Sequence, residues 1–77
     1  MARTDAPTEL VESLKRWRRE TALAAGVPAY VIFHDATLTA IAAARPKNLN
    51  DLLRVSGVGE SKLRKYGDEV LDLLQRQ

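Results

Sequence analysis

The sequence predicts an all-α fold, a compact orthogonal bundle of about five helices with tight connections and a helix–GVG–helix hairpin. Apolar residues recur at the helical period along most of the chain, and proline, glycine and N-cap residues divide that pattern into short segments. One segment, VPAYVIF at 27–33, contains β-branched and aromatic residues, but the chain offers no second strand. Because a lone strand cannot satisfy its backbone groups, this segment does not argue for a sheet.

The first predicted helix spans residues 8–25, between Pro7 before its first turn and Gly26 after its last. Its buried stripe consists of residues three or four positions apart: Leu10, Leu14, Trp17, Thr21 and Ala24. Arg18 lies at the edge of the stripe, where its stem can cover apolar surface. Leu23 lies about 180° from the stripe by the helical period. We expect it on the surface, either as an isolated exposed leucine or as an apolar anchor for another protein domain.

Four further elements follow along the chain. Residues 27–33 are expected to form a connection, extended or a short 3₁₀ turn, whose side chains fill the core. A second helix covers about residues 35–44, and a third begins after Asn48, a good N-cap. The hairpin helix GESKLRKY is expected to end at Gly67, and a last helix to begin at Asp68. The predicted core comprises Leu10, Leu14, Trp17, Ile32, Phe33, Leu38, Ile41, Leu52, Leu63, Val70 and Leu74.

The 77 residues are expected to form one domain over residues 8–77, after a flexible segment of residues 1–7. There is no cysteine, so the fold must rest on packing. Lys and Arg number 12 against 10 Asp and Glu, a net charge of +2 that permits nucleic-acid contact without requiring it. No apolar run approaches the roughly 20 residues of a membrane span, and the start of the chain lacks the apolar stretch of a signal peptide. We expect an intracellular protein, cytoplasmic or nucleoid-associated, that is monomeric and makes no membrane contact.

The sequence gives little support for catalysis. Its single histidine, His34, precedes Asp35 at a predicted helix start and is interpreted as a helix-entry residue. A metal site needs several ligands at compatible spacing, and no such set is visible. The serines have no evident base beside them. We therefore predict that this domain is not itself an enzyme and needs neither a cofactor nor a metal.

The hairpin segment GVGESKLRKYG is the first candidate for a binding site. Gly57 and Gly59 allow the backbone to approach a ligand closely, and a helix N-terminus favours an anion such as phosphate. Lys62 and Lys65 lie on one face of the predicted helix, about 60° apart. Glu60, in the first turn of the same helix, competes with phosphate for the helix dipole. Two interpretations stay open, phosphate contact or a tight helix–helix connection only.

Tyr30 and the basic run KRWRR at 15–19 are two further candidates. An exposed Tyr30 beside Pro28 could stack on an unpaired base, worth roughly 1–3 kcal/mol, whereas a buried Tyr30 would fill the core. The basic run places Arg16 and Arg19 away from the apolar stripe. It is either a nucleic-acid patch or an ordinary solvated helix face of mixed charge.

The order and spacing of YVIFHDATL, ARP and GVGESKLRKYG resemble the HRDC domain, the helicase and ribonuclease D C-terminal module. The resemblance runs from about Leu10 to Leu74 and is strongest to the modules of RecQ-type DNA helicases. It implies a bundle of about five helices and a noncatalytic accessory role in an ATP-dependent helicase. The module would help its parent to engage single-stranded or branched DNA. The family's DNA-facing surface would fall here on Tyr30, Lys62 and Lys65.

The acidic residues depart from a strongly basic DNA-binding pattern. Four of them fall on the hairpin and last helix: Glu60, Asp68, Glu69 and Asp72. With Leu23, they suggest a surface for docking on other domains of the parent helicase, which is an alternative to DNA binding. A further alternative is an accessory domain of a ribonuclease D-type nuclease.

Overall fold

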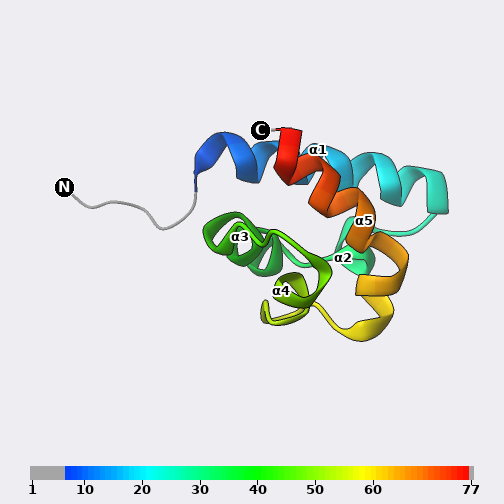
Figure 1. Cartoon of the computed structure of the whole chain (residues 1–77). Coiled ribbons are helices and arrows are strands. Elements are labelled where there is room, and N and C mark those ends of the chain that lie inside the picture. Colours follow the sequence, from blue (N-terminus) through cyan, green and yellow to red (C-terminus); the bar gives the residue numbers. More distant parts are fainter. Residues whose placement is uncertain (1–6, 77) are drawn as a thin grey trace.

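Helices are the regular elements of residues 7–76, the part of the chain that the computed structural model describes. In chain order they are α1 (Thr8–Ala25), α2 (Ala29–Ile32), α3 (Asp35–Ala44), α4 (Leu49–Leu53) and α5 (Glu60–Arg76) (Figure 1). The predicted all-α fold of about five helices is confirmed. Of the segment predicted to be flexible, residues 1–6 lie outside the described part.

The first and last helices pack together. α1 contacts α2, α3 and α5, while α4 contacts α5 (Figure 1). α1 therefore forms one side of the bundle, with α2, α3 and α5 packed against it and α4 packed against α5. This arrangement brings the α1 residues near position 17 close to the middle of α5, about fifty positions later in the sequence.

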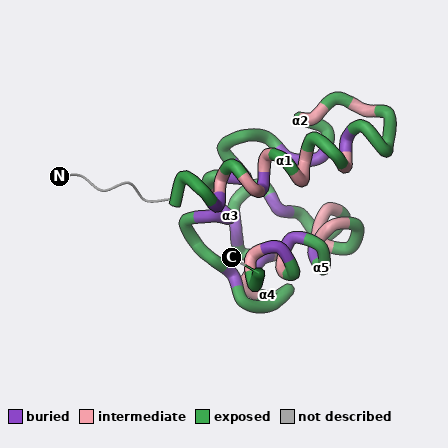
Figure 2. The backbone as a smooth tube through the Cα atoms, turned by 90° about the horizontal axis from the view of Figure 1, so that it is seen from above, coloured by how far each residue is buried: buried purple, intermediate pink, exposed green. Residues whose placement is uncertain are grey.

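The core draws residues from every helix and from the α4–α5 connection (purple in Figure 2). Its buried apolar members are Leu10, Leu14, Ala22, Ile32, Phe33, Leu38, Ile41, Ala42, Leu52, Val55, Val58, Val70 and Leu73. The prediction was right for eight of eleven positions, whereas Trp17, Leu63 and Leu74 are half-buried and pack against the core from its edge. Near the end of α1 the buried residue is Ala22, whereas Ala24 of the predicted stripe is exposed.

The segment 27–33 differs from its prediction, because it contains one turn of α-helix, α2. Pro28 precedes the turn with φ −63° and ψ 152°, and a proline there sacrifices no helical hydrogen bond. The Phe33 N–H closes the turn on the Ala29 carbonyl, and Phe33 itself is extended. As expected, Ile32 and Phe33 fill the core. Being helical, the segment points Tyr30 and Val31 outward instead.

The prediction that one helix ends at Gly67 and another begins at Asp68 was wrong, since α5 runs unbroken through both. A glycine inside a helix costs about 1 kcal/mol relative to alanine, so it can be kept where packing needs it. Gly67 is buried under α4, and a Cβ at this position would lie 2.7 Å from Leu49 Cδ2. The glycine thus marks close contact between helices rather than a helix end.

Two of the expected helix ends are confirmed by their backbone geometry. Gly26 closes α1 in the left-handed region, with φ 72° and ψ 33°, and its N–H bonds back to the last turn. Asn48 caps α4, because its side-chain oxygen accepts a hydrogen bond of 2.8 Å from the Asp51 N–H. These local signals were readable in the sequence because each acts within four residues.

Candidate functional site

Tyr30 stands out on the surface of α2. Its side chain is 61% exposed, so it does not fill the core. Its ring stacks near that of His34, with 6.1 Å between ring centroids and 24° between planes. An open depression beside the two rings is lined by Arg18, Ala29, Tyr30, His34, Asp35 and Ala36. An aromatic ring in this position can offer its face to a flat ligand.

Two cations hold the end of α2, the helix that carries Tyr30. The Lys62 ammonium donates to the carbonyl oxygens of Val31 and Ile32, the second at 2.7 Å. Arg18 donates to the carbonyl oxygen of Phe33 at 2.9 Å. We call this arrangement the α2 clamp: the side chains of Lys62 and Arg18 on the three consecutive carbonyls of residues 31–33. It ties α1 and α5 to one short turn.

Arg18 also pairs with an acid at the start of α3. Its guanidinium lies 2.7 Å from the Asp35 carboxylate, and the Arg18 side chain is only 12% exposed. Hydrogen bonding and the charge of Arg18 hold the pKa of Asp35 below its usual value of 3.8. Because the folded-state pKa is depressed, this pair stabilises the fold above pH about 4 and loses that contribution as the pH falls. Sequence reasoning placed Arg18 only at the edge of the stripe and missed both contacts.

The two hairpin glycines have different roles. Gly57 has a positive φ of 94°, and a Cβ there would lie 2.2 Å from Oγ1 of the buried Thr37 on α3. Val58 enters the core directly after it. Gly59 faces open space. Gly57 is therefore needed for a close contact between the hairpin and α3. This role agrees with the second of the two interpretations above, in which the segment is a tight helix–helix connection. Phosphate contact by this segment stays a prediction.

The predicted pair of hairpin lysines does not share one environment. Lys62 is half-buried in the α2 clamp, and its Nζ lies 5.6 Å from the centre of the Phe33 ring. Lys65, one turn later on α5, is exposed. Glu60 is also exposed and lies 4.0 Å from Arg64 on the same helix. Of the two lysines, Lys65 is the one available to a phosphate.

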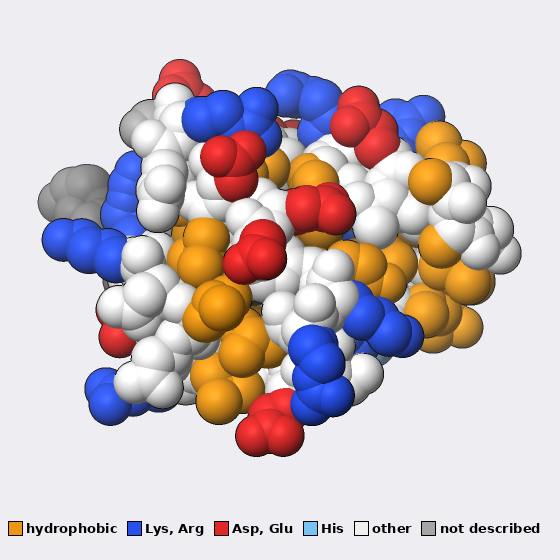
Figure 3. All heavy atoms as spheres, turned by 45° about the vertical axis from the view of Figure 1, so that its right-hand side comes forward, with side chains coloured by type: hydrophobic (Ala, Val, Ile, Leu, Met, Phe, Trp, Pro, Cys, Tyr) orange, Lys and Arg blue, Asp and Glu red, His pale blue; other side chains and the backbone are white. Residues whose placement is uncertain are grey.

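The basic run on α1 is exposed at both of its candidate residues, Arg16 and Arg19. Neither forms an ion pair with any residue between positions 7 and 76. Figure 3 shows one face of the molecule, on which basic and acidic side chains alternate around exposed apolar groups. This mixed surface agrees with a net charge of only +2. Whether the run contacts nucleic acid stays a prediction.

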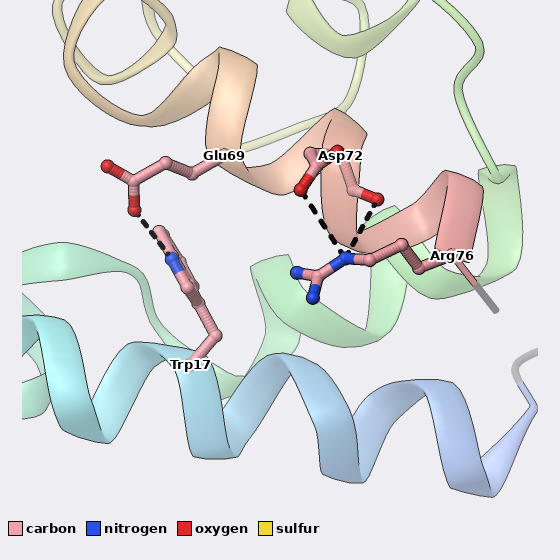
Figure 4. Close-up of polar contacts among 4 residues, drawn as sticks. All are labelled: Trp17, Glu69, Asp72 and Arg76. Carbon is pink, nitrogen blue, oxygen red and sulfur yellow. Dashed lines mark hydrogen bonds and ion pairs between the residues drawn. The ribbon is translucent and has the colours of Figure 1, made fainter.

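The acidic residues of α5 are partly engaged within the domain (Figure 4). Glu69 accepts a hydrogen bond of 2.9 Å from Nε1 of Trp17, which joins α5 to α1. Asp72 lies 3.3 Å from Arg76 one turn later. Asp68 is exposed, as is Leu23 on α1, whose side chain is 74% accessible. The expected surface position of Leu23 is thus confirmed, whereas a docking role for these residues stays a prediction.

The described residues meet neither the requirements of a metal site nor those of a membrane-spanning helix. Between positions 7 and 76 no three His, Asp or Glu side chains are grouped so that they could hold a metal ion. In the same stretch no helix has the length and apolarity needed to cross a membrane. The exposure of Tyr30 on α2 makes the candidate site an exposed aromatic turn on a small helical scaffold.

Fold and motif order together define a known class of small helical module. The family model of the HRDC domain matches residues 8–74, and this chain belongs to the HRDC family. A solved structure described as D. radiodurans RecQ HRDC domain 3 superposes with a TM-score of 0.84 at 40% sequence identity, over 87% of this chain and 88% of that one.

Two curated relatives are whole helicases. The ATP-dependent DNA helicase UvrD2 of Mycobacterium tuberculosis is 45% identical over 71 residues, which is 92% of this chain and 10% of the helicase. The ATP-dependent DNA helicase RecQ of Bacillus subtilis is 43% identical over 67 residues, or 87% of this chain and 11% of the helicase. The chain thus spans about a tenth of the length of each.

Proposed function

We propose that this domain is a noncatalytic accessory module of a RecQ-like DNA helicase that contacts single-stranded or branched DNA through a surface centred on Tyr30. The observation that carries the proposal is the 61% exposure of Tyr30 on a turn that is anchored in the core by Ile32 and the following Phe33. Helicases among its relatives support the assignment of the parent. An intracellular location, with access to DNA, is part of the same proposal.

Two kinds of DNA contact would be made at this surface, base stacking by Tyr30 and phosphate contact by Lys65. Tyr30 would stack on an unpaired base, which tolerates any sequence because every base has a π-face. Lys65 lies three residues beyond Lys62 on α5, so its exposed ammonium is one helical turn from the α2 clamp. It would contact the phosphate backbone, with Arg16 and Arg19 as additional candidates on α1. No cofactor is needed for such contacts.

The mixed surface charge implies weak, salt-sensitive binding. With about two to four phosphate contacts, log K should fall against log salt with a slope of about −1.4 to −2.8 for single strands. Titration of the 77-residue chain into a labelled oligonucleotide at several salt concentrations measures this slope. An affinity that does not change with salt would rule out the proposed phosphate contacts.

Replacing Tyr30 by alanine is expected to weaken binding by roughly 5- to 150-fold, the loss of one stacked base. The salt slope should stay nearly constant, because stacking releases few counterions. Since Tyr30 is exposed, the melting temperature should change little. Tyr30→Phe is the matched control and should keep most of the affinity. Equal affinities for wild type and Tyr30→Ala would remove Tyr30 from the interface.

Docking on other domains of the parent is a second candidate function, favoured by Leu23. A leucine exposed to 74% among charged residues contributes little to its own core. Leu23→Glu is expected to leave the isolated domain folded and its DNA affinity only slightly changed. In the full-length helicase it should alter substrate binding or unwinding. Unchanged activity of that full-length variant in both assays would leave Leu23 as an ordinary surface residue.

A further inference from the structure

We infer that Lys62 and Arg18 are positioning residues, which fix the turn that presents Tyr30 rather than binding phosphate themselves. The inference deepens the proposed function and rests on it for its DNA readout. It gives different roles to Lys62 and Lys65, which the sequence analysis had placed together on one DNA-facing surface. The contacts of the α2 clamp carry it, since they assign the Lys62 ammonium to backbone carbonyls on another helix.

The end of α2 is a place where a cation is needed. A helix leaves its last carbonyls without intrahelical partners, and these carry the negative end of the dipole. In α2 the Ala29 carbonyl is satisfied by the Phe33 N–H, while the next turn never forms. The carbonyls of Val31 and Ile32 instead accept from Lys62, and that of Phe33 accepts from Arg18.

α2 depends on such outside support. Its four residues are far fewer than the roughly 12–15 that an isolated helix needs to be even marginally stable. On its inner side, Ile32 and Phe33 are anchored in the core. On its outer side, Tyr30 and Val31 have no such anchor, and the carbonyl of Val31 is held by Lys62. The clamp therefore sets the direction in which the outer residues project.

Lys62 has little capacity left for DNA. An ammonium group has three donors, and two of them are used on Val31 and Ile32. Its charge also lies 5.6 Å from the Phe33 ring centre, within the range of a cation–π contact. A phosphate that recruited Lys62 would have to break these contacts. Lys65, exposed on the same helix, has no such commitment within the described residues and serves as the internal comparison.

The test compares Lys62→Met with Lys65→Met in the 77-residue chain, using a fluorescein-labelled oligothymidylate and a salt series. Lys65→Met should make the salt slope shallower by about 0.7, the value for one single-strand phosphate contact. Lys62→Met should weaken binding by no more than Tyr30→Ala does, with the slope unchanged. It should also be non-additive with Tyr30→Ala, since both would remove the same stacking contact. A slope reduced by 0.7 in Lys62→Met, or full additivity, would overturn the inference.

A readout without DNA keeps the inference separate from the proposed function. Lys62→Met should accelerate amide hydrogen exchange at residues 29–33, whereas Lys65→Met should not. Lys62→Arg, which keeps the cation and its donors, should restore slow exchange. If Tyr30→Ala leaves DNA binding unchanged while this pattern holds, the proposed function fails and the clamp stands. Unaltered exchange in Lys62→Met would refute the clamp itself.

A measurement on the unmodified chain covers the case in which Lys62→Met does not fold. The ammonium protons of Lys62 should be visible by NMR because their hydrogen bonds slow exchange with water, and those of Lys65 should not. Addition of the oligothymidylate should then perturb Lys65 and leave the Lys62 ammonium in place. Transfer of the Lys62 ammonium to the oligonucleotide would contradict a positioning role.

Discussion

Trp17→Ala is expected to lower the free energy of unfolding by about 3 kcal/mol, at the lower end for buried tryptophan because Trp17 is only half-buried. The indole packs against two rings, with centroids 6.1 Å from that of Phe33 and 5.8 Å from that of Tyr66. These two rings also contact each other, at 6.0 Å, so the substitution opens a three-ring cluster. It also removes the hydrogen bond to Glu69.

For a domain of this size, a loss of 3 kcal/mol corresponds to a fall in melting temperature of roughly 12–24 °C. Thermal unfolding followed by circular dichroism at 222 nm measures it. Trp17→Phe, which keeps an aromatic ring but not the N–H donor, is the matched control and should lose much less. A melting temperature within a few degrees of wild type for Trp17→Ala would show that the cluster contributes little to stability.

Gly57→Ala is expected to destabilise the domain by about 3 kcal/mol through two separate effects. A positive φ costs an L-residue on the order of 1–2 kcal/mol, and overfilling a packed site costs typically 1–3 kcal/mol. Both apply here, because φ is 94° and the added methyl group would meet Oγ1 of Thr37 at 2.2 Å. Thr37 cannot easily move aside, since it is buried and branched at Cβ.

Gly59→Ala is the control, two residues away in the same hairpin. A Cβ at Gly59 meets nothing within 4 Å, and its φ is not positive, so the cost should be at most about 1 kcal/mol. Denaturant titration of both variants gives the comparison. Equal stabilities of Gly57→Ala and Gly59→Ala would show that the hairpin can move away from α3 without cost.

The sequence was informative wherever a local interaction decides the structure. Gly26 ends α1 and Asn48 begins α4 because their partners lie within four residues, so residue type and position are enough to predict them. The helical period likewise located most of the core and the outward position of Leu23. Gly67 shows where local reasoning fails, since its role is set by Leu49, eighteen positions earlier on another helix.

The candidate site depends more heavily on distant partners. Pattern and charge made Tyr30 and Lys62 candidate site residues, but did not show that Tyr30 is exposed or that the Lys62 ammonium is hydrogen bonded to backbone carbonyls. Those carbonyls belong to Val31 and Ile32, which lie 31 and 30 positions before Lys62 in the sequence. No spacing rule connects Lys62 with residues so far away. Arg18 was missed as a site residue for the same reason, since its two partners lie fifteen and seventeen positions away.

The packing of α1 against α5 has a consequence for protein synthesis. Leu14 on α1 is fully buried, yet Val70 and Leu73, which help to close the same core, lie on α5 and are translated after the other four helices of the domain. The Trp17–Glu69 hydrogen bond likewise spans 52 positions. A nascent chain that has emerged only as far as α4 could pack α1 against α2 and α3, but the part of α1 that contacts α5 would still be exposed to solvent. Folding of this domain on the ribosome should therefore be completed only when α5 has emerged, and chaperones could reach this part of α1 before α5 covers it.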